Sequence, residues 1–315
     1  MWALTYRCNM SCEYCYLHDK IHNWSELSSK EIISLAHSIA ENDQWKPDAI
    51  WLTGGEPTIV SCLPQIIQIF NKSNIKSIIT TNGYCNSYVL NSILQSVPRG
   101  INVSIDSFDS EKNERARAYT QEIIKNVKYI ARYKHPNTIL GASCVFTPDN
   151  IPLLKEFACD LQEAGVEYLS LNPISGKGKI FKKEDFDLLD IATREIKEKI
   201  GLQIPSSFFI SLVKDYFLAN GKMFLKCPAG NSFYFISPWG EWFPCSNEMW
   251  QSNAYKVNTP DITSITDGLA GDLDYNVINT YLNEKYQVND IFTDSMCFSD
   301  RCIGCWKLYY DTIFT

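Results

Sequence analysis

The sequence has little of what nucleic-acid-binding and membrane proteins need. Its 315 residues include 29 Lys and Arg and 36 Asp and Glu, so the formal charge is −7. The chain therefore has no excess of basic residues to bind the phosphates of a nucleic-acid backbone. No apolar run approaches the roughly 20 residues of a spanning helix, and no basic segment followed by an apolar one marks a signal peptide. We therefore expect a cytoplasmic protein with neither nucleic acid nor membrane as a partner.

Histidine is scarce, with 4 residues, but cysteine is abundant, with 12. Disulfide scaffolds are usually short secreted chains, whereas this chain is long enough for a full core. Clustered spacing therefore favours metal ligands in a reducing compartment. Cys8, Cys12 and Cys15 follow the first apolar run as CxxxCxxC. Three thiolates at this spacing can hold an iron–sulfur cube and leave its fourth iron open for another ligand.

Short apolar runs alternate with amphipathic segments from residue 2 to about residue 200. The runs are partly β-branched and bounded by turn residues, which predicts buried strands at 2–6, 49–53, 75–80, 101–105, 140–146 and 168–171. Helical spacing predicts helices at 63–70, 87–94, 121–133, 153–164 and 185–199, and Ser28 with Glu31 forms a capping box ahead of an earlier one.

This alternation predicts a parallel α/β sheet with right-handed crossovers, either an open doubly wound sheet or a partial barrel. In both architectures, ligands bind at the carboxyl ends of the strands. The candidate motifs lie at four such ends in succession: the cysteine triplet, then Gly54-Gly55-Glu56-Pro57, then Thr81-Asn82-Gly83, then Ser104 with Asp106. We therefore expect them to meet at one edge of the sheet.

These motifs in this order resemble the radical S-adenosylmethionine (SAM) enzymes over about residues 1–200. The resemblance implies a partial (β/α)6 TIM-type barrel and a 4Fe-4S cluster on Cys8, Cys12 and Cys15, whose open iron binds SAM. Cleavage of SAM would give a 5'-deoxyadenosyl radical that abstracts a substrate hydrogen. The resemblance also implies cofactor contacts for Tyr14, Gly54, Gly55, Glu56, Thr81, Asn82, Ser104, Asp106 and Arg117.

Each cofactor-binding candidate also has a purely structural interpretation. The glycine motif alone is a common turn, and Thr81 with Asn82 can simply shape another. Ser104 and Asp106 can cap the helix that follows. Arg117 lies among charged residues, which is typical of a solvated face, and the aromatic between the cysteines can belong to the core.

The chain changes character near residue 201, where aromatics become frequent and a turn at Pro238 separates two strand-like runs. We therefore predict two domains, 1–200 and 201–315. The second resembles the shortened auxiliary-cluster module called twitch, since the longer SPASM module needs seven cysteines and this region has five. The resemblance implies a second 4Fe-4S cluster, with zinc as the open alternative for four thiolates, on Cys227, Cys245, Cys302 and Cys305.

Cys297 is the odd cysteine of this region. We keep three interpretations open for it: a catalytic thiol that donates a hydrogen atom, a fifth cluster ligand, or a buried thiol that only packs.

An auxiliary cluster offers an electron sink, so we expect net oxidation of the substrate and a reductant partner such as flavodoxin or ferredoxin. The leading hypothesis is oxidative cross-linking or α-carbon chemistry on a ribosomally made peptide. The rivals are a dehydrogenase acting on a sugar or cyclitol alcohol and a non-catalytic iron–sulfur electron carrier. Because the first strand begins at residue 2, we expect the peptide to bind through a separate partner or directly, with a basic run as its candidate contact: Lys177, Lys179, Lys182 and Lys183.

Metal analysis separates a second cluster from zinc. Anaerobically purified protein is expected to hold about eight iron atoms per chain if each cysteine set holds one cube. Replacing Cys302 and Cys305 by Ala is expected to remove about half of that iron. Zinc in the wild type, with an iron content that this double substitution leaves unchanged, would contradict the second cluster.

Overall fold

The predicted strands form one sheet in the computed structural model, which describes residues 1–15, 17, 25–42, 46–114, 117–174, 181–218 and 234–243. Its order is β6-β5-β4-β3-β2-β1-β7-β8. The strands are β1 (Trp2–Thr5), β2 (Ala49–Gly54), β3 (Lys76–Thr81), β4 (Gly100–Ser104), β5 (Ile139–Phe146), β6 (Tyr168–Pro173), β7 (Phe235–Ile236) and β8 (Trp242–Phe243). Strands β1 to β6 pair in parallel, as predicted.

Helices fill every crossover between these strands. They are α1 (Ser29–Ala40), α2 (Leu63–Lys72), α3 (Ser87–Gln95), α4 (Ser110–Glu114), α5 (Thr120–Tyr133), α6 (Leu154–Glu163), α7 (Lys183–Glu195) and α8 (Ser207–Leu218). The capping box of α1 is confirmed, because the Ser28 side chain accepts from the Glu31 backbone N–H and the Glu31 carboxylate accepts from that of Ser28. The sequence did not predict α4, which is one turn long, or α8, which is mostly apolar.

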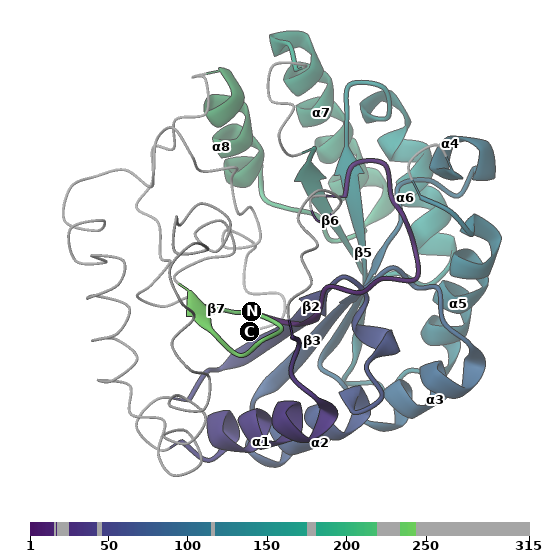
Figure 1. The fold of residues 1–315 in the computed structure, drawn as a ribbon. Coiled ribbons are helices and arrows are strands. Elements are labelled where there is room, and N and C mark those ends of the chain that lie inside the picture. Colours follow the sequence, from purple (N-terminus) through teal and green to yellow (C-terminus); the bar gives the residue numbers. More distant parts are fainter. Residues whose placement is uncertain are drawn as a thin grey trace, which may run out of the picture.

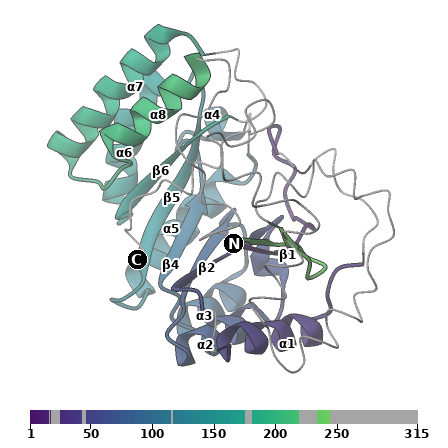
Figure 2. The same cartoon turned by 90° about the vertical axis from the view of Figure 1, so that its left-hand side faces the viewer.

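The strand order decides between the two expected architectures. Each crossover from β1 to β6 moves the chain one strand in the same direction, so right-handed crossovers place successive helices on the same face. Figure 1 shows the helices as an arc outside the strands, and Figure 2 shows α1 to α3 at one end of it and α6 to α8 at the other. Within the described residues, β6 does not pair back to β1. The fold is therefore the expected partial barrel and not a doubly wound sheet.

Side chains alternate between the two faces of the sheet, as strand geometry requires. On the outer face, Trp2, Leu4 and Leu52 pack with helical residues such as Phe70 in the main hydrophobic core. On the inner face, a smaller cluster of Ile78 and Tyr168, with Ala49, Trp51 and Ile139 packed against it, fills the barrel near the amino ends of the strands. The carboxyl ends are thus left for polar groups.

The turn predicted at Pro238 is present between β7 and β8, which pair antiparallel. β7 adds to the sheet beside β1, where Phe235 and Trp239 pack with Ala3 and Tyr6. The domain boundary near residue 201 stays a prediction. No described helix combines the length and apolar character needed to cross a membrane.

The outer core is tested by shortening one of its largest side chains. Phe70→Ala is expected to lower the free energy of unfolding by about 3–5 kcal/mol, because the ring is 0% exposed and its removal leaves a cavity. Chemical denaturation measures this, with Tyr88→Ala, at an 80% exposed position, changing stability by no more than about 0.5 kcal/mol. Equal effects of the two substitutions would contradict the packing described.

Candidate functional site

The glycine turn after β2 packs directly on the backbone that follows β1. The Gly55 N–H donates to the Thr5 carbonyl at 2.6 Å, and the Glu56 N–H donates to the Arg7 carbonyl at 3.0 Å. A Cβ on Gly54 would lie 2.1 Å from the Thr5 oxygen, and one on Gly55 would lie 2.3 Å from the Arg7 oxygen. Gly54 also has φ +139°, a conformation that side chains disfavour. No side chain therefore fits at either position, because the backbone at the start of the cysteine loop lies too close.

Glu56 is fully buried and joins the end of β2 to the end of β3. Its Oε1 accepts from the Thr58 N–H at 3.0 Å and from the Thr81 hydroxyl at 2.7 Å, and its Oε2 accepts from the Asn82 N–H at 2.7 Å. Burial raises the pKa of Glu56, and these hydrogen bonds act against that shift. Because the carboxylate is buried among donors of the chain, any cofactor contact of this turn falls to its backbone.

Thr81 and Asn82 shape the turn after β3, as their purely structural interpretation predicts. Asn82 also contacts the cysteine loop. The Thr81 hydroxyl accepts from the Gly83 N–H at 3.0 Å. The Asn82 amide donates to Asn9 Oδ1 at 2.8 Å and lies 3.7 Å from Cys8 Sγ. The end of β3 is thus a second support for this loop.

The three predicted cluster ligands lie together on the loop at the carboxyl end of β1. Cys8 is exposed, Cys12 and Cys15 are half-buried, and the Cys15 N–H donates to the Cys12 carbonyl at 3.0 Å. Burial raises the pKa of Cys8 and of Cys12. The buried Glu56 carboxylate raises the pKa of Cys8 further, whereas the Arg117 charge acts against the rise at Cys12.

The donor set on this loop is of the type that an iron–sulfur cube takes. Cys8, Cys12 and Cys15 supply three free thiols, and a cube binds each thiolate on a separate iron. Within the described ranges, no three His, Cys, Asp or Glu side chains converge on one point as ligands of one metal ion.

Asp106 ties the cysteine loop to the strand ends. Its Oδ2 accepts from Arg117 Nε at 2.8 Å and from the Tyr14 hydroxyl, and its Oδ1 accepts from the Val145 N–H at 2.7 Å. Burial raises the pKa of Tyr14, and the Asp106 charge raises it further, so the phenol stays protonated.

Two structural interpretations from the sequence are wrong. Asp106 does not cap the helix that follows, because Asp109 Oδ1 accepts from the Glu111 N–H at the start of α4. Arg117 is not on a solvated face: it is 8% exposed, and its guanidinium lies 5.2 Å from the centre of the Tyr14 ring. Burial lowers the pKa of Arg117, but the charge and hydrogen bond of Asp106, together with smaller contributions from neighbouring groups, raise it overall, so the group stays charged. Ser104 lies half-buried at the end of β4.

Glu26 is a site residue that the sequence did not reveal. Its carboxylate accepts from the Thr5 hydroxyl at 2.7 Å, the Tyr6 N–H at 2.7 Å and Arg7 Nε at 3.2 Å. It belongs to no motif, and only the return of the chain to β1 brings it there. It thereby supports the start of the cysteine loop, in addition to the glycine turn.

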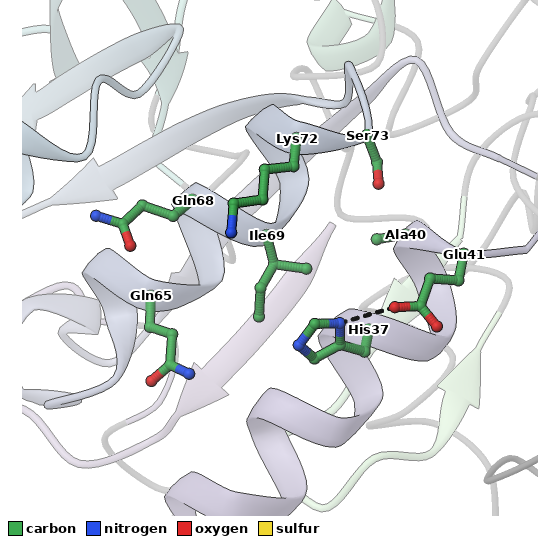
Figure 3. A pocket seen from close by; sticks show the side chains of 8 residues that line it. All are labelled: His37, Ala40, Glu41, Gln65, Gln68, Ile69, Lys72 and Ser73. Carbon is green, nitrogen blue, oxygen red and sulfur yellow. Dashed lines mark hydrogen bonds and ion pairs between the residues drawn. The ribbon is translucent and has the colours of Figure 1, made fainter.

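Two hollows are found among the described residues. One, of about 400 Å³, opens beside Tyr14 and Asp106 and is also lined by carboxylates that include Asp109, Glu156 and Asp160. The other, of about 430 Å³, lies between α1 and α2 (Figure 3), where His37 Nδ1 and Glu41 Oε1 are 2.9 Å apart. The second hollow lies near the C-terminal ends of these helices, and so at the opposite end of the barrel from the cysteine loop.

The predicted auxiliary ligands lie outside the described residues, as does Cys297. The second cluster and the role of Cys297 therefore stay predictions. Of the basic run, Lys177 and Lys179 lie outside as well. The four predicted ligands of the second cluster that lie outside the described residues are Cys227, Cys245, Cys302 and Cys305.

Residues 2–150 match the model of the Radical SAM superfamily, so this part of the chain is similar to the radical SAM domains. The curated relatives include a putative glycyl-radical enzyme activating enzyme of Methanocaldococcus jannaschii, 26% identical over 42% of this chain and 49% of its own length. They also include a probable GTP 3',8-cyclase of Sulfurisphaera tokodaii, 28% identical over 64% of this chain and 65% of its own length. The chain thus spans less than two thirds of either relative, and their activities bear on it only as proposals.

Solved structures share the fold over more of the chain. Streptococcus suis SuiB bound to the precursor peptide SuiA has a TM-score of 0.65 and 16% identity, over 96% of this chain and 70% of that one. Native anSMEcpe with bound AdoMet and a peptide has a TM-score of 0.62 and 14% identity, over 90% of this chain and 82% of that one. At these identities the likeness establishes the fold alone.

The role of the buried Glu56 carboxylate is tested by Glu56→Gln. An amide keeps one acceptor oxygen and adds a donor, so at least one of the three donors that now meet the carboxylate loses its partner. The substitution is expected to lower the free energy of unfolding by about 1–3 kcal/mol in chemical denaturation. Glu41→Gln, whose side chain is 71% exposed, serves as the control and is expected to change it by less than about 0.5 kcal/mol. A neutral Glu56→Gln would refute the anchoring role.

Proposed function

We propose that this chain is a radical SAM enzyme that modifies a ribosomally made peptide by oxidative cross-linking or α-carbon chemistry. The observation that carries the proposal is the loop of three thiols, held by the glycine turn at the open end of a partial barrel. The match of residues 2–150 to the Radical SAM superfamily supports it. An electron carrier needs neither an open coordination position nor a turn built against the cluster loop.

In this proposal Cys8, Cys12 and Cys15 hold a 4Fe-4S cluster. When bound together, that cluster and SAM supply an electron and a cleavable carbon–sulfur bond, which yields a 5'-deoxyadenosyl radical. The chain's own contribution is to orient the cofactor at the strand ends and to keep water from it. The backbone of Gly54 and Gly55 and the hydroxyl of Ser104 are the proposed direct contacts, because the Glu56 and Asp106 carboxylates are already occupied by donors of the chain.

Two observations favour a peptide over a nucleotide as the substrate. The peptide-bound structures of SuiB and anSMEcpe share the fold over 96% and 90% of this chain. The hollow beside Tyr14 is also lined by carboxylates such as Asp109 and Glu156, which would repel a triphosphate. A sugar or cyclitol alcohol remains the alternative small-molecule substrate.

The proposal extends to the C-terminal region. Cys227, Cys245, Cys302 and Cys305 would hold an auxiliary 4Fe-4S cluster that takes the electron released when the substrate radical is oxidised. Cys297 would then be a thiol near the reaction that donates a hydrogen atom. Flavodoxin or ferredoxin is the proposed reductant.

The proposed activity is tested by SAM cleavage. Reconstituted, reduced wild-type protein is expected to release 5'-deoxyadenosine from SAM, measured by chromatography, and Cys12→Ala is expected to reduce the release to background. Cys159→Ala, which removes a half-buried thiol of α6, is the control and should retain the release. Equal release by wild type and Cys12→Ala would contradict the proposal. Adding a candidate precursor peptide, GTP or a sugar alcohol in parallel then identifies the substrate class by the product formed.

A further inference from the structure

The cysteine loop is held on both sides of Cys12 before any metal is present. Its start is fixed by Glu26 and by the glycine turn, and Asn9 is fixed by Asn82. Beyond Cys12, the Tyr14 hydroxyl donates to Asp106. Leu17, past the last cysteine, is buried in the cluster that contains Ala3 and Trp239. Between Cys12 and Cys15 the support shown by a side-chain hydrogen bond is that of Tyr14.

The partner of Tyr14 is a buried ion pair. The side chains of Arg117 and Asp106 are 9% and 7% exposed, and they lie 2.8 Å apart. A buried pair of this kind contributes little net stability, because removing both charges from water offsets their attraction. Its best-attested use is to fix one arrangement of the chain. Here it joins the segment after α4 to the carboxyl end of β4, and the Val145 N–H adds β5.

Arg117 also contacts the aromatic face of Tyr14, with its guanidinium carbon 5.2 Å from the ring centre. The phenol therefore meets the carboxylate by its hydroxyl and the guanidinium by its ring. This double contact fixes both the position and the tilt of Tyr14, and Lys cannot reproduce it because an ammonium lacks the planar fork.

We propose that Tyr14, Asp106 and Arg117 form a loop lock that places Cys12 and Cys15 for cluster assembly. The three residues act by positioning the loop. This inference rests on the proposed function only for the cluster, because the lock itself belongs to the metal-free chain.

The lock is tested on metal-free protein by the rate of thiol alkylation, read at each cysteine by mass spectrometry. Tyr14→Phe is expected to speed labelling of Cys12 and Cys15 several-fold with little change in the unfolding midpoint. Tyr129→Phe is the matched control. It also removes a tyrosine hydroxyl that donates to a side chain, Asn91 Oδ1 at 2.7 Å, but that hydrogen bond joins α5 to α3 and lies outside the cysteine loop. Unchanged labelling in Tyr14→Phe, or equal acceleration in both variants, would overturn the lock.

The contribution of Arg117 to the lock is tested in the same assay. Arg117→Lys is expected to speed labelling of Cys12, because an ammonium cannot hold the Asp106 carboxylate and the Tyr14 ring together as the planar guanidinium does. Labelling of Cys12 at the wild-type rate in folded Arg117→Lys would overturn the role of Arg117. Because labelling uses metal-free protein, a wild type that cleaves no SAM would refute the proposed function and leave the lock standing.

Discussion

The contact between the glycine turn and the backbone of residues 5–7 is the constraint on which the site depends. It brings the carboxyl end of β2 so close to the start of the cysteine loop that no Cβ fits on Gly54 or Gly55. Glu56, the next residue, carries the constraint to β3 through Thr81 and Asn82. Three adjacent strand ends therefore fix the thiol loop by backbone contacts and one buried carboxylate.

The site uses two buried carboxylates in different ways. Glu56 is surrounded by neutral donors, two of them backbone N–H groups, so it serves as a fixed acceptor between strand ends. Asp106 is paired with the buried Arg117, so its charge is compensated inside the barrel wall. Removing either from its donors would leave a buried group unsatisfied, which is costly in a low-dielectric interior. This explains why polar residues at strand ends can be structural and still control the site.

The parallel sheet could be predicted from the sequence because each buried strand is a short apolar run bounded by turn residues. β1 to β6 lie within two residues of the predicted ranges, and the motifs at their ends meet as expected. The sequence did not reveal which side chains contact each other in the site. Arg117 sits among charged neighbours in sequence but is buried by tertiary contacts, and Glu26 reaches β1 only because the chain returns there. The short helix α4 has too few residues to show a helical period, and the polar residues of α8, such as Ser211 and Asp215, are few among apolar ones.

The central claim is that Cys8, Cys12 and Cys15 hold a cluster with one iron open to SAM. EPR spectroscopy of reduced protein, with Cys302 and Cys305 replaced by Ala, tests it most directly. The account predicts a signal of a reduced 4Fe-4S cluster whose g values change when SAM is added. A signal that SAM leaves unaltered, or a reconstituted protein with no cluster signal at all, would contradict it.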